Sequence, residues 1–414
     1  MSRKNLKTLF HMNLAEYKNE YNCRFNDEDT IHLPVNIGEY PAFICQTPEI
    51  YKIIVNIERM DKAVSEIKLP GVAEEQYINK CLIDEIILTN NIEGVHSTRK
   101  EIGDILHDLS NKSKRNRFVG LVAKYEKLAQ REKIDFKCCE DIRRLYDDIF
   151  YEEIEAIEPE NLPDGKIFRK SAVEVLSPSQ KVIHNGLYPE SKIIDTMEKS
   201  LFILNDESLD FLIRIAVFHY FFGYIHPFYD GNGRTSRFIS SYLLSQNLNP
   251  LIAFRLSYTI KENIKKYYDA FDICNNPLNK GELTPFVEMF LGIVEASMKQ
   301  LLNSLEDKLS RLCFYDDFIN FLYKHNKNAS KLYSVLIQAS LFTNIGISRD
   351  ELISYMECSE NTLRKMLSGI PEELLLINQR KNKKFYLLNL DEVDKRIQED
   401  FSAKTPNLDI NPIK

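Results

Sequence analysis

Apolar positions recur at helical spacing along most of the chain. Residues 141–154, 209–225 and 286–305 each carry an apolar stripe with a period near 3.6 residues, which predicts three long helices. Glycine and proline are scarce, at 14 and 15 residues, and most prolines fall between the helical stretches. The chain is therefore predicted to be mainly α-helical, with a helical bundle at its centre.

The stretch Phe211–Ile225, FLIRIAVFHYFFGYI, is apolar on every side. A helix with this pattern is normally buried in a core. It is too short to cross a bilayer, and Arg214 and His219 interrupt it. The apolar rhythm resumes at residues 238–244, so the polar loop at 226–237 lies between two predicted core helices.

The loop HPFYDGNGRTSR, residues 226–237, opens the second of these helices. The first amides of a helix have no internal partners and bind anions. Gly231 and Gly233 would allow a phosphate to approach closely, and Asn232 could add a neutral donor. Two arginines three residues apart would both face such a ligand and suit phosphate oxygens; they are Arg234 and Arg237.

Two further residues of the loop supply chemistry. Asp230 would repel a bare phosphate, so its presence favours a magnesium ion between carboxylate and phosphate. His226 has an unperturbed pKa near ~6.5 and is the natural general base for a hydroxyl nucleophile.

The same loop matches, without a gap, the signature His-x-Phe-x-(Asp/Glu)-Gly-Asn-Gly-Arg-x-x-Arg, and the chain resembles Fic-domain proteins. The resemblance implies a Fic-type helical bundle that transfers AMP from ATP to a Ser, Thr or Tyr hydroxyl of a protein. It implies that His226 deprotonates that hydroxyl and that Asp230 holds magnesium on the α and β phosphates. The implied phosphate contacts are an anion hole from Gly231, Asn232 and Gly233, the β phosphate on Arg234 and the γ phosphate on Arg237.

A second pattern, Thr89-Asn90-Asn91-Ile92-Glu93-Gly94, ends an apolar-periodic helix. It fits the family's inhibitory pattern, (Ser/Thr)-x-x-x-Glu-(Gly/Asn), and its position implies the class with an N-terminal inhibitory helix. By this resemblance Glu93 pairs with Arg237 and deprives the γ phosphate of its cation. Gly94 is a candidate C-terminal cap, and Thr98 with Glu101 predicts a capping box for the next helix.

Two more segments are candidates for the site. Residues 169–188 alternate apolar and polar positions around Ser177–Ser179, which predicts a hairpin. In the family such a flap clamps the target as an added strand, and its candidate residues here are Val173, Val175 and Val182; an ordinary surface hairpin is the alternative. Tyr267 and Tyr268, on a helix predicted over 261–271, could line an adenosine pocket, although core packing is the commoner fate of such tyrosines.

The C-terminal region has its own order of elements. An apolar stripe over 331–341 is followed by a capping box at Ser348 and Glu351 and by a third helix that begins after Ser359. Apolar runs at 374–378 and 385–388 then flank a basic turn. This order resembles a winged helix-turn-helix.

A module of this kind can bind DNA, with its second helix in the major groove. Thr362, Arg364 and Lys365 would then face outward, and the basic turn at 379–384 would contact phosphates. Residues 331–384 contain eight basic against six acidic residues, a net charge of +2, while the whole chain carries −7. Because this excess is small for a nucleic-acid module, docking of a protein or dimerisation stands as an equal alternative.

A chain of 414 residues is too long for one core. The predicted segments are an N-terminal helical region with the inhibitory helix (1–105), a Fic catalytic domain (106–305), a connecting helix or linker (306–328), a winged-helix-like domain (329–400) and a flexible tail (401–414). With 44% hydrophobic and 28% charged residues, the chain has the composition of a soluble globular protein. None of the eight cysteines forms a Cys-x-x-Cys pair, so reduced thiols in a cytoplasm are expected, without a zinc ribbon or disulfide framework. The basic start lacks a following apolar run, so no signal peptide is predicted.

The expected partners are ATP with Mg²⁺, an unknown target protein and the chain itself as a target of self-modification. A homodimer stays open, and no membrane partner is expected. Two alternatives to the transferase remain: removal of AMP or transfer of another phosphate-linked group on the same fold, and a regulator that binds DNA through the C-terminal module.

Overall fold

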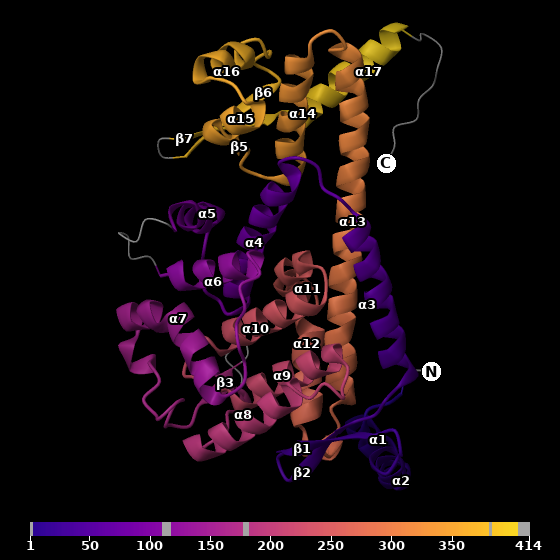
Figure 1. The fold of residues 1–414 in the computed structure, drawn as a ribbon. Coiled ribbons are helices and arrows are strands. Elements are labelled where there is room, and N and C mark those ends of the chain that lie inside the picture. Colours follow the sequence, from indigo (N-terminus) through magenta and orange to yellow (C-terminus); the bar gives the residue numbers. More distant parts are fainter. Residues whose placement is uncertain (1–2, 110–116, 177–181, 381–382, 405–414) are drawn as a thin grey trace. The chain divides into compact units, whose positions relative to one another are not determined.

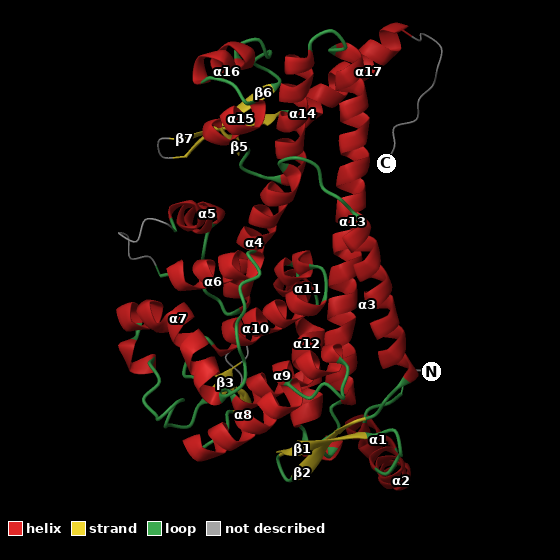
Figure 2. Cartoon of the chain, viewed as in Figure 1, coloured by secondary structure: helices red, strands yellow, loops and turns green. Residues whose placement is uncertain are grey.

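The computed structural model describes residues 3–109, 117–176, 182–380 and 383–404 (Figures 1 and 2). Helices dominate, and the strands form three small sheets with the orders β1–β2, β3–β4 and β5–β7–β6. The prediction of a mainly α-helical chain is confirmed. The chain divides into two compact units, a larger one from residues 1–66 and 81–302 and a smaller one from 67–80 and 303–414.

The larger unit begins with two helices and a hairpin. Its elements are α1 (Leu6–Met12), α2 (Leu14–Phe25), β1 (Ile31–Ile37), β2 (Tyr40–Ile44) and α3 (Pro48–Glu66). The hairpin was not predicted, since this region was expected to be helical. Its signal is nevertheless local: Leu33, Val35 and Ile37 alternate as buried positions, and Gly38 turns the chain with φ of +59°.

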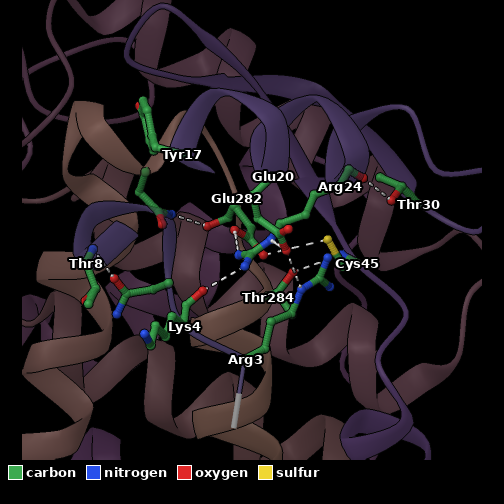
Figure 3. Close-up of polar contacts among 12 residues, drawn as sticks. Arg3, Lys4, Thr8, Tyr17, Glu20, Arg24, Thr30, Cys45, Glu282 and Thr284 are labelled. Atoms are coloured by element: carbon green, nitrogen blue, oxygen red, sulfur yellow. Dashed lines mark hydrogen bonds and ion pairs between the residues drawn. The ribbon is translucent and has the colours of Figure 1, made fainter. Parts of the chain in front are cut away.

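A buried arginine fastens this N-terminal segment to the rest of the larger unit (Figure 3). Arg24, only 2% exposed, donates through Nε to Glu20 at 2.9 Å and through Nη1 to Glu282 at 2.9 Å. Its Nη2 donates to the carbonyl of Lys4 at 2.7 Å. Two carboxylates therefore neutralise the buried charge, which burial otherwise makes costly.

The centre of the larger unit is a packed group of helices. Its elements are α4 (Ala73–Ile92), α5 (Arg99–Asp108), α6 (Val119–Ala129), α7 (Cys139–Ile157), η1 (Pro159–Asn161), β3 (Glu174–Leu176), β4 (Val182–Asn185), α8 (Glu190–Leu204), α9 (Phe211–Ile225), α10 (Asn232–Asn247), η2 (Pro250–Phe254), α11 (Leu256–Glu262), α12 (Ile264–Asn275) and η3 (Pro277–Asn279). α9 packs against both α8 and α10 and is buried on nearly every side, as its uniformly apolar sequence predicts.

The helix predicted over 261–271 is interrupted. Asn263 separates α11 from α12 with φ of −110° and ψ of 23°, and its Nδ2 donates to the carbonyl of Thr259 at 3.0 Å. The asparagine side chain competes with the backbone for helical hydrogen bonds, which favours a break at this position.

The smaller unit contains the C-terminal elements. They are α14 (Lys327–Phe342), β5 (Ile347–Ser348), α15 (Arg349–Met356), α16 (Glu360–Leu367), β6 (Leu375–Arg380), β7 (Lys383–Leu388) and α17 (Leu390–Lys404). The capping box of Ser348 and Glu351 is present, and Ser359 caps α16 as predicted. Helices and strands follow the order on which the winged-helix prediction rests, and membership of that class stays a prediction.

Two helices contribute to both units. α4 gives residues 73–80 to the smaller unit and 81–92 to the larger, and α13 (Thr284–Leu322) divides after residue 302. α13 runs unbroken through residue 305, where a boundary was predicted. α17 continues helically to Lys404, within the expected tail. Residues 405–414, the turn Ser177–Ser179 and Lys381 lie outside the described residues.

Candidate functional site

The loop between α9 and α10 is held by its own side chains. His226 ends α9 in the left-handed region, with φ of +52°, and its amide donates to the carbonyl of Phe222. Phe228 is fully buried, with its ring stacked 3.6 Å from that of Tyr146. The Tyr146 hydroxyl donates to the carbonyl of Asp230 at 3.0 Å. These contacts fix the loop between a buried core helix and the first turn of α10.

The start of α10 can receive an anion. Gly231 precedes the helix with φ of +76°, a conformation that favours glycine. The amides of the first turn have no partner within the helix and carry its positive dipole end. α10 therefore begins where the sequence predicted a phosphate-binding helix N-terminus.

The side chain of Asn232 binds the main chain of the loop. Its Oδ1 accepts from the amide of Phe228 at 2.9 Å, and its Nδ2 donates to the carbonyl of Phe228 at 2.8 Å. One of the two N–H groups of the side-chain amide thus closes the loop, and Asn232 also lines the cavity beside it. Its role as a neutral donor to a phosphate stays a prediction.

Arg237 is fully engaged by the end of α4. Its Nε donates to Thr89 Oγ1 at 2.8 Å and its Nη2 to the carbonyl of Thr89 at 2.9 Å. Its Nη1 donates to Glu93 Oε1 at 2.8 Å. The guanidinium is only 1% exposed. The structure thus brings together the two motifs that the sequence places 144 residues apart.

Glu93 lies directly over the loop. A Cβ atom added to Gly233 would lie 2.0 Å from Glu93 Oε1, so only glycine leaves room for this carboxylate. The Glu93 side chain is 34% exposed. Burial alone would raise its pKa, but the Arg237 guanidinium outweighs this and holds the pKa of Glu93 below its ordinary value. Gly94 follows with φ of +75°, in agreement with its predicted role as a C-terminal cap.

His226 faces the same cavity, which has a volume of about 290 Å³. Burial lowers the pKa of His226 to about 4, against an opposing influence of the Glu93 carboxylate. The imidazole is therefore neutral near pH 7, the state that a general base requires. The cavity also contacts Gly233, Arg237 and Ser236.

Arg234 does not line this cavity. Its Nη1 donates to Glu153 Oε1 at 2.8 Å, its Nη2 lies 3.3 Å from Asp230 Oδ2, and its guanidinium lies over the ring of Phe150. Both Arg234 and Glu153 are buried. Of the two signature arginines, Arg237 therefore lines the cavity and Arg234 does not.

Asp230 is the candidate magnesium ligand. Its side chain is half exposed, and its Oδ1 accepts from the amide of Gly231 at 2.6 Å. Within the described ranges no cluster of three or more His, Cys, Asp or Glu residues could hold a metal by itself. A single carboxylate fits an ion that a nucleotide's phosphates also bind, because Mg²⁺ is usually held by one or two carboxylates plus phosphate oxygens.

The predicted hairpin is present beside the cavity. β3 and β4 are antiparallel, with Val175 opposite His184, and both residues line the cavity together with Glu174. Val173 lies just before β3, and its carbonyl accepts from the amide of Gly186. The side chain of Val182 lies outside the described residues.

Tyr267 and Tyr268 both line the cavity. Tyr267 is nearly buried, and its hydroxyl shares a hydrogen bond of 2.8 Å with Nε2 of the buried His219. Tyr268 is half-buried. Tyr267 thus packs in the core and also presents a face to the cavity, so the two interpretations of this pair are compatible.

Several site residues were not identified from the sequence. Glu153 and Tyr146 lie on one face of α7 and belong to no local motif. Only their contacts with Arg234 and Asp230 in the structure identify them as site residues. Other cavity residues that sequence reasoning missed are Glu174, His184, Gly223, Ser236, Phe271 and Asn275. His184 could have been noticed, because it is a histidine within the predicted hairpin.

Known proteins resemble the chain in this region. The model of the Fic/DOC family matches residues 136–244. This part of the chain is a Fic domain. It includes α7, the β3–β4 hairpin, α9 and most of α10, and therefore every loop residue described above.

Relatives of the Fic domain share limited stretches of sequence. Protein adenylyltransferase fic-1 of Caenorhabditis elegans is 31% identical over 121 residues, which are 26% of this chain and 22% of that protein. Protein adenylyltransferase Fic of Aedes aegypti is 35% identical over 83 residues, 20% of this chain and 15% of that protein. The chain thus spans less than a quarter of the length of these two relatives.

Among solved structures, a Fic family protein from Desulfovibrio desulfuricans G20 aligns with a TM-score of 0.49 and 18% identity, over 87% of this chain and 98% of that one. None of the helices in the described ranges is long and apolar enough to span a membrane.

Proposed function

We propose that this chain is an autoinhibited protein adenylyltransferase that moves AMP from ATP to a Ser, Thr or Tyr hydroxyl of a protein. The observation that carries the proposal is the position of Glu93. Its carboxylate pairs with Arg237 and covers Gly233, in the same cavity as His226. The Glu93 carboxylate thus occupies the position at which Arg237 and Gly233 would bind a nucleotide phosphate, next to the neutral imidazole of His226. A carboxylate in this position would compete with the phosphate.

The transfer step uses groups of this chain. The neutral imidazole of His226 accepts the proton of the target hydroxyl. The hydroxyl oxygen forms a bond to the α-phosphorus of ATP, and the bond from that phosphorus to the oxygen of the leaving pyrophosphate breaks. The first amides of α10 stabilise the negative charge that develops on the phosphate.

Charged side chains around the loop would bind the β and γ phosphates. Arg237 takes the γ phosphate once Glu93 leaves it, and Arg234 takes the β phosphate if it turns from Glu153. Asp230 would hold Mg²⁺, which neutralises phosphate charge when bound. Tyr267 and Tyr268 would contact the adenosine, and the β3–β4 hairpin with Val173, Val175 and Val182 would align the target as an added strand.

The partners of the smaller unit stay a separate proposal. Thr362, Arg364 and Lys365 are exposed on α16, where the DNA-binding hypothesis requires them. Arg364 already donates to Asn361 at 3.2 Å on the same helix. DNA, a protein partner or a second copy of the chain therefore remain candidates for this surface.

The nucleotide is the part of the proposal that is most readily tested. Glu93→Gly protein is incubated with Mg²⁺ and ATP, UTP or CDP-choline, and the adducts on protein are identified by mass spectrometry. An adenylyl adduct formed from ATP alone supports the proposal. A uridylyl or phosphocholine adduct in place of it, or removal of AMP from a pre-modified protein without any transfer, would replace it.

A further inference from the structure

Arg169 is a buried charge that has no ion pair among the described residues. The residue is 0% exposed, and the hydrogen bonds of its side chain to described residues all go to backbone carbonyls. Burial lowers the pKa of Arg169, as expected for a cation removed from water. Such a group is normally retained only where hydrogen bonds compensate the lost hydration.

Four backbone carbonyls provide that compensation. Nε donates to the carbonyl of His226 at 2.8 Å, and Nη1 donates to that of Ser171 at 2.5 Å. Nη2 donates to the carbonyl of Leu187 at 2.9 Å and to that of Ile225 at 3.4 Å. One side chain therefore joins three pieces of main chain: the residue of the candidate base and the segments before and after the β3–β4 hairpin.

The main chain reinforces the same junction. The amide of Arg169 donates to the carbonyl of Pro227 at 3.2 Å, and the amide of Leu187 donates to that of Ile225 at 3.0 Å. Ile225 and His226 form the C-terminal end of α9, where unpaired carbonyls carry the negative end of the helix dipole. A cation is favourable there, which explains why the charge needs no carboxylate.

The packing leaves no spare room around this guanidinium. A Cβ atom added to Gly186 would lie 2.5 Å from Nη2 of Arg169 and 3.1 Å from Cβ of His226. Gly186 is thus required by the close approach of the arginine rather than by its own backbone angles. The site depends on a glycine and an arginine that belong to neither of the two sequence motifs.

We propose that Arg169 is a positioning residue that fixes the left-handed main chain of His226 and joins it to both ends of the β3–β4 hairpin. It does not line the cavity that holds His226. Its loss would let the base and the hairpin move independently, so that base and acceptor hydroxyl no longer meet in the reactive geometry. The transfer-rate consequence depends on the proposed function; the structural consequences do not.

The transfer experiment uses Arg169→Lys and Arg169→Met in the Glu93→Gly background. Lysine keeps the charge but cannot donate to four carbonyls at once. We expect kcat to fall by about 10²-fold, the loss typical of a misplaced catalytic group, with little change in KM for ATP because Arg237 and Gly233 are untouched. If Glu93→Gly with Arg169 intact transfers nothing, the proposed function fails and this arm does not apply.

Two measurements test the positioning role without transfer. Burial is the main cause of the low pKa of His226, and the Arg169 charge lowers it further, so Arg169→Met should raise that pKa above about 4, as measured by NMR titration. Hydrogen exchange should accelerate at the amides of Gly186 and Leu187 in both variants. Gly186→Ala, which keeps the arginine but displaces it, should give the same exchange pattern if Arg169→Met does not fold.

Arg24→Lys is the matched control. Arg24 is also a buried arginine, but its partners are Glu20, Glu282 and Lys4. It should lower the unfolding temperature while leaving the pKa of His226 and the hairpin exchange unchanged. An unchanged His226 pKa in folded Arg169→Met, with unchanged exchange in Arg169→Lys and Gly186→Ala, would overturn the proposal, as would an effect of Arg24→Lys equal to that of Arg169→Lys.

Discussion

Replacing Glu93 with glycine should free Arg237 for a phosphate, and the structure gives the size of the effect. The carboxylate accepts from Arg237 Nη1 at 2.8 Å, and its side chain is 34% exposed. Two unit charges about 4 Å apart attract by ~4 kcal/mol at an effective dielectric constant of about 20. Solvent screening and the cost of desolvating both groups reduce the net value to about 2 kcal/mol.

A net value of about 2 kcal/mol corresponds to a factor of about 30 in affinity. Titration calorimetry with ATP and Mg²⁺ should therefore show that Glu93→Gly binds ATP about 30-fold more tightly than the wild-type chain does. Glu93→Gln should fall between them, because its amide oxygen still accepts from Arg237 without a charge. A separate assay measures the rate of pyrophosphate release. This rate should rise from the wild-type chain through Glu93→Gln to Glu93→Gly.

Glu74→Gly is the matched control, because it removes an exposed glutamate from the first turn of the same helix, α4. It should leave both ATP affinity and pyrophosphate release unchanged. If Glu93→Gly has the same ATP affinity and the same rate of pyrophosphate release as Glu74→Gly, the ion pair with Arg237 does not limit nucleotide binding.

Three further predictions concern other residues. Asp230→Ala in the Glu93→Gly background should abolish the dependence of ATP affinity on Mg²⁺; affinity that still rises with Mg²⁺ would remove Asp230 from the metal site. Phe228→Ala should lower the free energy of unfolding by about 3–5 kcal/mol in urea titrations, because it empties a fully buried site stacked on Tyr146; a loss below 1 kcal/mol would contradict its role as a core anchor. Burial raises the pKa of Glu85 to about 7 from an ordinary 4.5. The protonated carboxyl therefore contributes about 3 kcal/mol to the free energy of unfolding below pH 4.5, and this contribution is lost as the pH rises through 7. Glu85→Gln should remove that loss from unfolding curves, and an unchanged pH dependence would show that another group causes it.

Local patterns predicted those parts of the molecule that local physics decides. α9 follows from an uninterrupted apolar run, and the caps at Thr98, Ser348 and Ser359 follow from side-chain oxygens placed before helices. The start of α10 after Gly231 follows from the glycines and arginines of one loop. The pairing of Glu93 with Arg237 came from a family resemblance, because no local rule joins residues so far apart.

The parts that were missed depend on contacts that neither the apolar pattern nor the motifs encode. Arg234 lies with Glu153 because a buried guanidinium takes the nearest available carboxylate, and that carboxylate comes from α7. Asn232 closes its own loop because both atoms of its amide meet the main chain of Phe228. The role of Arg169 depends on carbonyls from three separate segments, which no spacing in the sequence reveals.

The proposed function requires that His226 act as the base in adenylyl transfer and that Glu93 prevent this transfer. We would measure the intact mass of the wild-type chain, of Glu93→Gly and of Glu93→Gly/His226→Ala after incubation with ATP and Mg²⁺. Each protein is incubated with and without a lysate fraction that supplies possible targets. We expect adenylyl adducts, on the chain or on a target, with the Glu93→Gly single variant only. Equal adducts in the presence and absence of His226, or no adduct under any condition while ATP is bound, would contradict it.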